Sequence, residues 1–108
     1  MPRFAVYMNR NLRSTHFFPL LVDVQSELLQ DLETRVVIPL AKAAAFSGFP
    51  LRYVMPTVEL EGKAYVLMTP QLTGLSRVAL GPMRGTLVAH AREISTATDV
   101  LLRGFSGG

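Results

Sequence analysis

Apolar and polar residues alternate over several short stretches of the chain, and a period of two predicts β-strands. The alternation is clear at Phe4–Met8, and the branched and aromatic run at Phe17–Gln25 predicts a buried strand. A third strand is expected over Thr34–Leu40, where Pro39 should mark a strand end, a bulge or an edge because proline donates no ladder hydrogen bond. Asp23 falls inside the second strand, so its carboxylate needs a hydrogen-bonded partner or the solvent side of the sheet.

The middle of the chain carries a hairpin pattern. Tyr53–Leu60 and Lys63–Met68 alternate in the same way and are joined by a Glu-Gly turn, in which glycine permits a positive φ. The segment that follows is expected to be a loop, punctuated by Pro70 and Gly74. Arg77–Leu80 is expected to be the last strand, closed by the Gly-Pro pair after it. The pattern therefore predicts five or six short strands.

Three further segments lack strand periodicity. Ser26–Glu33 is predicted to be a polar connection whose leucines form an exposed apolar tip, and Lys42–Ala45 is predicted to form a short helical turn. From about Leu87 the period changes, because apolar residues now recur at helical spacing. They include Ile94, Ala97, Val100 and Leu101. This C-terminal helix is expected to be capped by Gly104.

Composition indicates one small packed domain. The chain has 108 residues, of which 49% are hydrophobic and 18% charged. A domain of this size hides its apolar surface only in part, so we expect some of that surface to be buried in a homodimer. The chain has no cysteine, which excludes disulfides, thiolate metal sites and cysteine nucleophiles. With no apolar run of spanning length and no signal-peptide pattern, we expect a cytoplasmic protein without membrane contact.

The charge pattern argues against direct nucleic-acid binding, and the absence of catalytic and metal-binding motifs argues against enzyme chemistry. The formal net charge is +3, and the basic residues are scattered from Arg3 to Arg103 rather than gathered in a run. The two histidines, His16 and His90, have no carboxylate or cysteine at ligand spacing, so no metal site is expected. Ser26 lacks the glycines of a nucleophile elbow, and the chain has no phosphate-binding loop. We therefore expect no cofactor and no catalytic residue.

Two strings in the first half of the chain carry a resemblance to a known family. Leu21–Leu29 reads L-V-D-V-Q-S-E-L-L, and Arg35–Leu40 reads R-V-V-I-P-L. Both resemble the signature of the CcdB toxins, which is roughly F-V-D-V-Q-S-D followed by R-x-V-I-P-L. Weaker similarity occurs at Tyr53–Gly62, at Met68-Thr69 and at the C-terminal helix. The resemblance spans about residues 2 to 105.

This resemblance implies a β-rich α+β fold: an SH3-like, barrel-type antiparallel sheet with a small accessory sheet and a C-terminal α-helix. It implies one toxin domain over residues 1–105, followed by a flexible tail at 106–108. It also implies a homodimeric toxin of a type II toxin–antitoxin pair. Such a toxin binds the A subunit of DNA gyrase and traps the enzyme on cleaved DNA, and a cognate, partly disordered antitoxin neutralises it.

The resemblance also assigns residues to these partners. The poisoning element of the family is a C-terminal Trp-Gly-Ile, which falls here on Arg103, Gly104 and Phe105, so that only the glycine is identical. The implied gyrase-binding residues are Asp99, Leu102, Arg103, Gly104 and Phe105. The implied antitoxin-binding residues are Ser26, Leu28, Leu29, Asp99 and Leu102.

Alternatives remain open at this stage. Arg103 could bind a partner, or it could simply place a favourable charge at the negative end of a helix. Its presence in place of tryptophan also leaves open an inactive relative that binds only antitoxin. The fold is shared with the MazF and Kid endoribonucleases, whose chemistry needs a base and a phosphate-stabilising group. Candidates for that chemistry are His16, Asp23, Glu27, Arg35 and Arg77.

Overall fold

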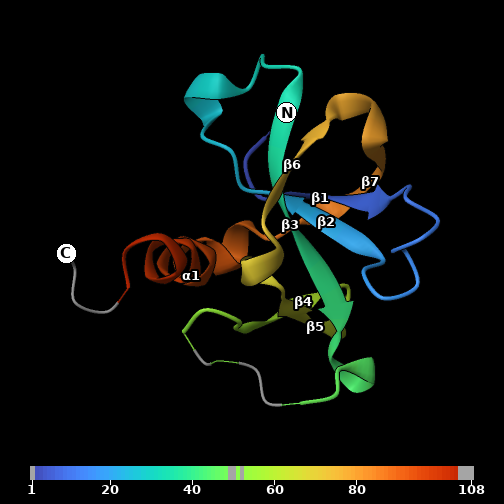
Figure 1. Ribbon diagram of the computed structural model, residues 1–108, viewed down its shortest axis with the longest axis vertical. Helices are drawn as coiled ribbons and strands as arrows, with labels where there is room; N and C mark the ends of the chain where they lie inside the picture. The colour runs from blue at the N-terminus through green and yellow to red at the C-terminus, as the bar shows by residue number, and fades with distance from the viewer. Residues whose placement is uncertain (1, 49–50, 52, 105–108) are drawn as a thin grey trace.

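A computed structural model describes residues 2–48, 51 and 53–104 of the chain. The described residues form one antiparallel sheet that curls into a half-barrel, with a single α-helix after it (Figure 1). The strand order is β4-β5-β3-β2-β1-β7, with β6 paired to β3 off this path. The strands are β1 (Ala5–Asn9), β2 (Leu20–Asp23), β3 (Thr34–Lys42), β4 (Thr57–Leu60), β5 (Lys63–Leu67), β6 (Thr73–Ser76) and β7 (Leu80–Thr86). The helix is α1 (Ala91–Arg103).

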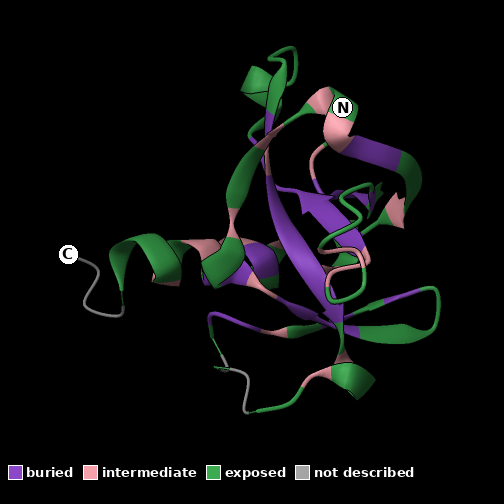
Figure 2. Cartoon of the chain, turned by 45° about the vertical axis from the view of Figure 1, so that its right-hand side comes forward, coloured by how far each residue is buried: buried purple, intermediate pink, exposed green. Residues whose placement is uncertain are grey.

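The main core lies between the inner face of the curled sheet and the first half of α1 (Figure 2). Alternate residues of β2 and β3, such as Val22 and Ile38, point into this core, and Ile94 and Ala97 enter it from the helix. All four are completely buried. A second, smaller cluster forms on the opposite face of the same strands around Leu21 and Tyr7. The predicted helical spacing identified Ile94 and Ala97 correctly, whereas Leu101 at the same spacing is 38% exposed.

The hairpin turn and the short helical turn were predicted correctly, but the first arm of the hairpin, β4, begins at Thr57 instead of Tyr53. Val58 of β4 pairs with Tyr65 of β5, and the turn residues Glu61 and Gly62 both have positive φ. The 3₁₀ turn η2 (Ala43–Ala45) lies where a helical turn was expected. The second strand is shorter than predicted, because Phe17 is 66% exposed and pairing begins only at Leu20.

The last part of the sheet differs from the prediction. Arg77–Ala79 forms the 3₁₀ turn η4 instead of a strand, and β7 begins at Leu80 and continues through Gly81 and Pro82. A Cβ on Gly81 would lie 2.9 Å from the main-chain oxygen of Met8, so glycine permits close strand approach here instead of ending the strand. Pro82 is tolerated because β7 ends the strand order and pairs with β1 alone.

The expected loop at Pro70 and Gly74 is also partly wrong. Thr73–Ser76 forms β6, in which Gly74 pairs with Val36 of β3. A Cβ on Gly74 would lie 3.3 Å from the Thr34 side chain, so here too glycine marks a close approach within a sheet. The interpretation of glycine as a turn or loop residue was therefore wrong at both Gly81 and Gly74. At each position the missing side chain makes room for a neighbouring strand.

Pro39 lies inside β3, which continues to Lys42, so a strand end at this position is wrong. The Val24 N–H donates to the Val36 carbonyl oxygen, and hydrogen-bonded pairs recur every second residue in an antiparallel ladder. The nitrogen of Pro39 therefore faces away from β2. On that side β3 pairs with β6 at residues 34–37 and with β5 at residues 40–42. Pro39 falls between the two paired segments. There its carbonyl oxygen accepts the Met68 N–H at 2.9 Å, and its nitrogen lies where neither β5 nor β6 pairs with it.

The start of α1 is attached to the hairpin through His90. Its Nε2 accepts a hydrogen bond from the Glu59 N–H at 3.2 Å, and its Nδ1 lies 2.9 Å from Glu93 Oε1. With Nε2 as the acceptor, the ring proton must sit on Nδ1, where it donates to the carboxylate. This bridge fixes where the helix begins, and the helix then extends away from the sheet (Figure 1).

Candidate functional site

A completely buried ion pair connects β2 to β3. Arg35 Nε donates to Asp23 Oδ2 at 2.9 Å, and both side chains are 0% exposed. Arg35 Nη2 lies 2.8 Å from the same oxygen, as an ion-pair contact outside hydrogen-bond geometry. The other carboxylate oxygen, Oδ1, accepts the Gln25 N–H at 3.0 Å. The partner that a buried Asp23 required is therefore Arg35, twelve residues along the chain.

The same arginine holds the connection between β2 and β3. Its Nη1 donates to the carbonyl oxygens of Leu29 at 3.2 Å and Gln30 at 2.8 Å. The side chain of Gln25 also donates to the Leu29 carbonyl at 2.7 Å, and its Oε1 accepts the Val36 N–H at 2.9 Å. A buried guanidinium and a buried amide thus satisfy main-chain groups that a short loop could not pair by itself.

This polar network turns the apolar side chains of the loop outward. Residues Glu27–Leu29 form the 3₁₀ turn η1, capped by Ser26, whose Oγ accepts the Leu28 N–H at 3.2 Å. With its carbonyls directed at Arg35, the loop leaves Leu28 93% exposed and Leu29 50% exposed. The prediction of an exposed apolar tip is confirmed, and the network that supports it explains its shape.

Tyr7 lies in the small cluster on the outer face of the sheet and is influenced by this network. Burial raises the pKa of its phenol, and the negative charge of Asp23 raises it further, while the positive charges of Arg35 and Arg77 act in the opposite direction. The phenol is therefore neutral at physiological pH and behaves as a packing residue.

The end of α1 forms a second exposed surface. Asp99, Leu102 and Arg103 are exposed, with Leu102 at 71%. Gly104 has φ 76° and ψ −176°, and its N–H donates to the Val100 carbonyl at 2.8 Å. Gly104 thus caps the helix as predicted, in a backbone region that only glycine adopts readily. Phe105 and the tail 106–108 lie outside the described residues.

The residues implied for partner binding occupy two separate surfaces of the chain. We call Ser26, Leu28 and Leu29 the loop surface, and Asp99, Leu102, Arg103 and Gly104 the tip surface. In both Figure 1 and Figure 2 the η1 turn and the C-terminal end of α1 lie well apart. Each surface offers apolar side chains next to polar ones. Such surfaces suit protein contacts better than chemistry on a small substrate.

The residues weighed for ribonuclease chemistry do not form an accessible site. Asp23 and Arg35 are fully buried and already paired, so neither can reach a phosphate. Arg77 does come close to them, because its guanidinium donates to the same Gln30 carbonyl. Glu27 lies on the exposed η1 turn. His16 lies elsewhere, in the N-terminal connection, where it lines a cavity. Three of the five candidates are thus brought together, but in a structural network.

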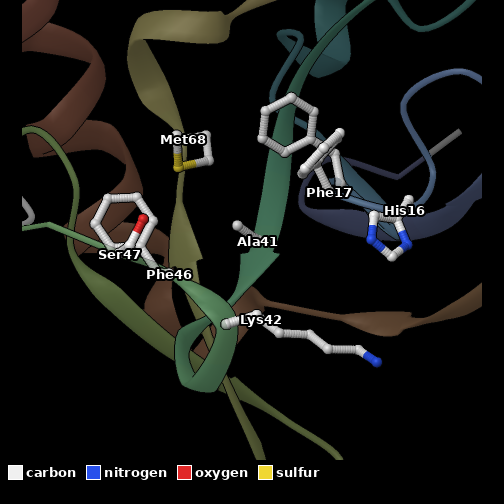
Figure 3. A pocket seen from close by; sticks show the side chains of 9 residues that line it. His16, Phe17, Ala41, Lys42, Phe46, Ser47 and Met68 are labelled. Carbon is white, nitrogen blue, oxygen red and sulfur yellow. The ribbon is translucent and has the colours of Figure 1, made fainter.

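That cavity is a feature that sequence reasoning missed (Figure 3). It has a volume of about 560 Å³ and lies between the N-terminal connection and the η2 turn. Its lining residues are His16, Phe17, Phe18, Ala41, Lys42, Ala45, Phe46, Ser47 and Met68. The only sequence signal was a phenylalanine pair at the edge of a strand, which was interpreted as part of that strand.

Among the described residues, no cluster of three or more histidine, aspartate or glutamate side chains could hold a metal ion. Within that same part of the chain, no helix is long and apolar enough to cross a membrane. The family model described as CcdB protein matches residues 3–104 of the chain. The match includes the sheet, the loop surface and the tip surface as far as Gly104.

Proposed function

The chain belongs to the CcdB family, the toxins of toxin–antitoxin systems, and we propose that it binds the A subunit of DNA gyrase and traps the gyrase–DNA cleavage complex. The observation that supports this proposal most is the tip surface. It ends a rigid helix and carries an exposed leucine, an exposed arginine and the glycine that the resemblance assigns to the poisoning element. The proposed mechanism is binding without covalent chemistry, so the protein is not itself an enzyme.

Arg103 in this proposal has two compatible roles. It is exposed and stands in the last turn of α1, where a positive charge stabilises the negative end of the helix dipole. From the same position its planar guanidinium is available for a carboxylate or an aromatic ring of the target. The family tryptophan offers a large apolar surface instead, so we propose that this chain binds its target with more polar contacts. Phe105 would supply the apolar contact next to the glycine.

We further propose that a cognate antitoxin covers the loop surface, together with Asp99 and Leu102, and that the toxin is a cytoplasmic homodimer. The hydrophobic fraction of 49% in a domain this small supports a dimer, because a second copy could cover apolar surface that one chain leaves exposed. Residues 1–105 are proposed to act as one toxin domain, since the helix and the sheet share one core.

The function is tested by mixing the purified protein with gyrase and supercoiled DNA, after light scattering has established its mass. Linear DNA released by detergent and protease is the expected product. An RNA digestion runs in parallel, and cut RNA without linear DNA would favour the ribonuclease branch of the fold. Neither product from a folded protein would leave an inactive relative, or one that acts on a topoisomerase other than the gyrase used.

The loop surface gives a separate prediction. Leu28→Asp is expected to weaken antitoxin binding by about 2 kcal/mol, or roughly thirtyfold, because it puts a charge at the centre of an apolar contact. Since Leu28 is 93% exposed, stability should change by less than about 0.5 kcal/mol. Isothermal titration with the antitoxin measures the first effect and urea unfolding the second.

Leu12→Asp is the matched control, because Leu12 is 90% exposed and lies in the N-terminal connection, away from the loop surface. It should leave antitoxin affinity unchanged. Equal affinities for the two variants would remove the loop surface from the antitoxin contact.

A further inference from the structure

The cavity beside the η2 turn is built differently from the loop and tip surfaces. Its walls come from three segments: the connection carrying His16 to Phe18, the end of β3 and the chain from Ala45 to Ser47. Met68 closes a fourth side, as Figure 3 shows. About 560 Å³ is within the usual range for pockets that bind small molecules, which is roughly 300–1,000 Å³.

The walls of this cavity are mainly apolar, and their aromatic side chains remain partly exposed to solvent. Phe17 is 66% exposed, and Phe46 is only partly buried, although both rings face the same space. The floor is Ala41, whose methyl group leaves depth that a larger side chain would fill. An apolar group entering the cavity would remove aromatic surface from water on two sides, which is the main favourable contribution to binding at such sites.

The lining of the cavity contains basic side chains but no acidic one. Lys42 and His16 contribute an ammonium and an imidazole, and no carboxylate belongs to the lining. Lys42 is exposed at the end of β3, and among the described residues it has no ion pair or hydrogen-bond partner for its ammonium. Figure 3 shows this side chain extending away from Phe46 and Met68 and ending on the same side of the view as His16.

We propose that this cavity binds a small amphipathic monocarboxylate, whose ring or short branched chain lies between Phe17 and Phe46 and whose carboxylate pairs with Lys42. The site lies outside the proposed gyrase and antitoxin surfaces and stands independently of them. An ammonium at a rim that is open to water gives a modest charge preference, because solvent screens the pair. The apolar walls provide most of the affinity, and Lys42 selects the anion.

The probes are 4-phenylbutyrate and its neutral counterpart 4-phenylbutanol, titrated into the ¹⁵N-labelled protein and followed by amide chemical shifts. Both should shift the amides of the cavity lining, and the carboxylate should bind about threefold to fivefold more tightly. Lys42→Gln should abolish that preference without changing the affinity for the alcohol. Phe17→Ala should weaken both probes at least about fivefold.

Lys63→Gln is the matched control, because Lys63 is the other lysine of the chain, exposed on β5 and absent from the cavity lining. Both substituted lysines are exposed, so both variants should keep the dispersed amide spectrum of the folded protein. Equal affinity for the two probes, or a preference that survives Lys42→Gln, would overturn the proposal. Shifts at the cavity on raising protein concentration alone would assign it to a second copy of the chain, which also overturns it.

Discussion

Arg35→Met is expected to lower the free energy of unfolding by about 3–5 kcal/mol. The substitution leaves the Asp23 carboxylate completely buried with only the Gln25 N–H as a partner. It also releases the carbonyls of Leu29 and Gln30, which Arg35 holds at 3.2 and 2.8 Å. A small domain has only about 5–15 kcal/mol of total stability, so this loss brings the protein close to unfolding at 37 °C. Urea unfolding followed by circular dichroism measures it.

Two comparisons separate the buried pair from a general effect of losing an arginine. Arg84→Met removes the exposed contact with Glu61, whose charged atoms are 3.8 Å apart, and should cost less than about 1 kcal/mol. Asp23→Leu combined with Arg35→Met removes both charges and should recover part of the loss, since no unpaired charge then remains buried. A loss below about 1 kcal/mol for Arg35→Met alone would contradict the role assigned to the pair.

The fold was predictable wherever one local rule decided the outcome. The alternation of apolar and polar residues around Val58 and around Tyr65 predicted the two strands of the hairpin. The spacing of Ile94 and Ala97 predicted that these two residues of α1 are buried. Both patterns depend only on which side of an element meets the core. Two of the errors occurred at Gly81 and Gly74. There a glycine makes room for a strand distant in sequence, and no local pattern reports that contact.

In the candidate site, too, the features set by local sequence were predictable, and those set by contacts between distant segments were not. The exposure of Leu28 followed from its polar neighbours, and the structure bears it out. The support beneath it did not follow, because the pairing of Asp23 with Arg35 depends on the register of β2 and β3. The cavity at Phe17 and Phe46 was equally hidden, since it forms between segments about thirty residues apart. The partner surfaces themselves came from the family resemblance rather than from any periodicity.

Gly104→Lys is expected to reduce formation of the gyrase cleavage complex by about thirtyfold to hundredfold, or roughly 2–3 kcal/mol of binding. The glycine follows the last turn of α1, and a Cβ added to it would meet nothing within 4 Å, so the new lysine would extend into the surface proposed to meet gyrase. Its φ of 76° also disfavours any other residue, by about 1–3 kcal/mol if the conformation is kept. Linear DNA at increasing toxin concentration measures the effect.

Gly62→Lys is the control that makes this result interpretable. Gly62 has φ 77° and likewise nothing within 4 Å of an added Cβ, but it lies in the β4–β5 turn, far along the chain from the tip. The two variants thus introduce the same charge at a glycine of positive φ. If both lose activity together, strain or charge is the cause, and the tip surface loses its assigned role. If only Gly104→Lys loses activity while antitoxin binding and unfolding midpoint persist, the end of α1 is the element that contacts gyrase, with Arg103 beside it in place of an aromatic ring.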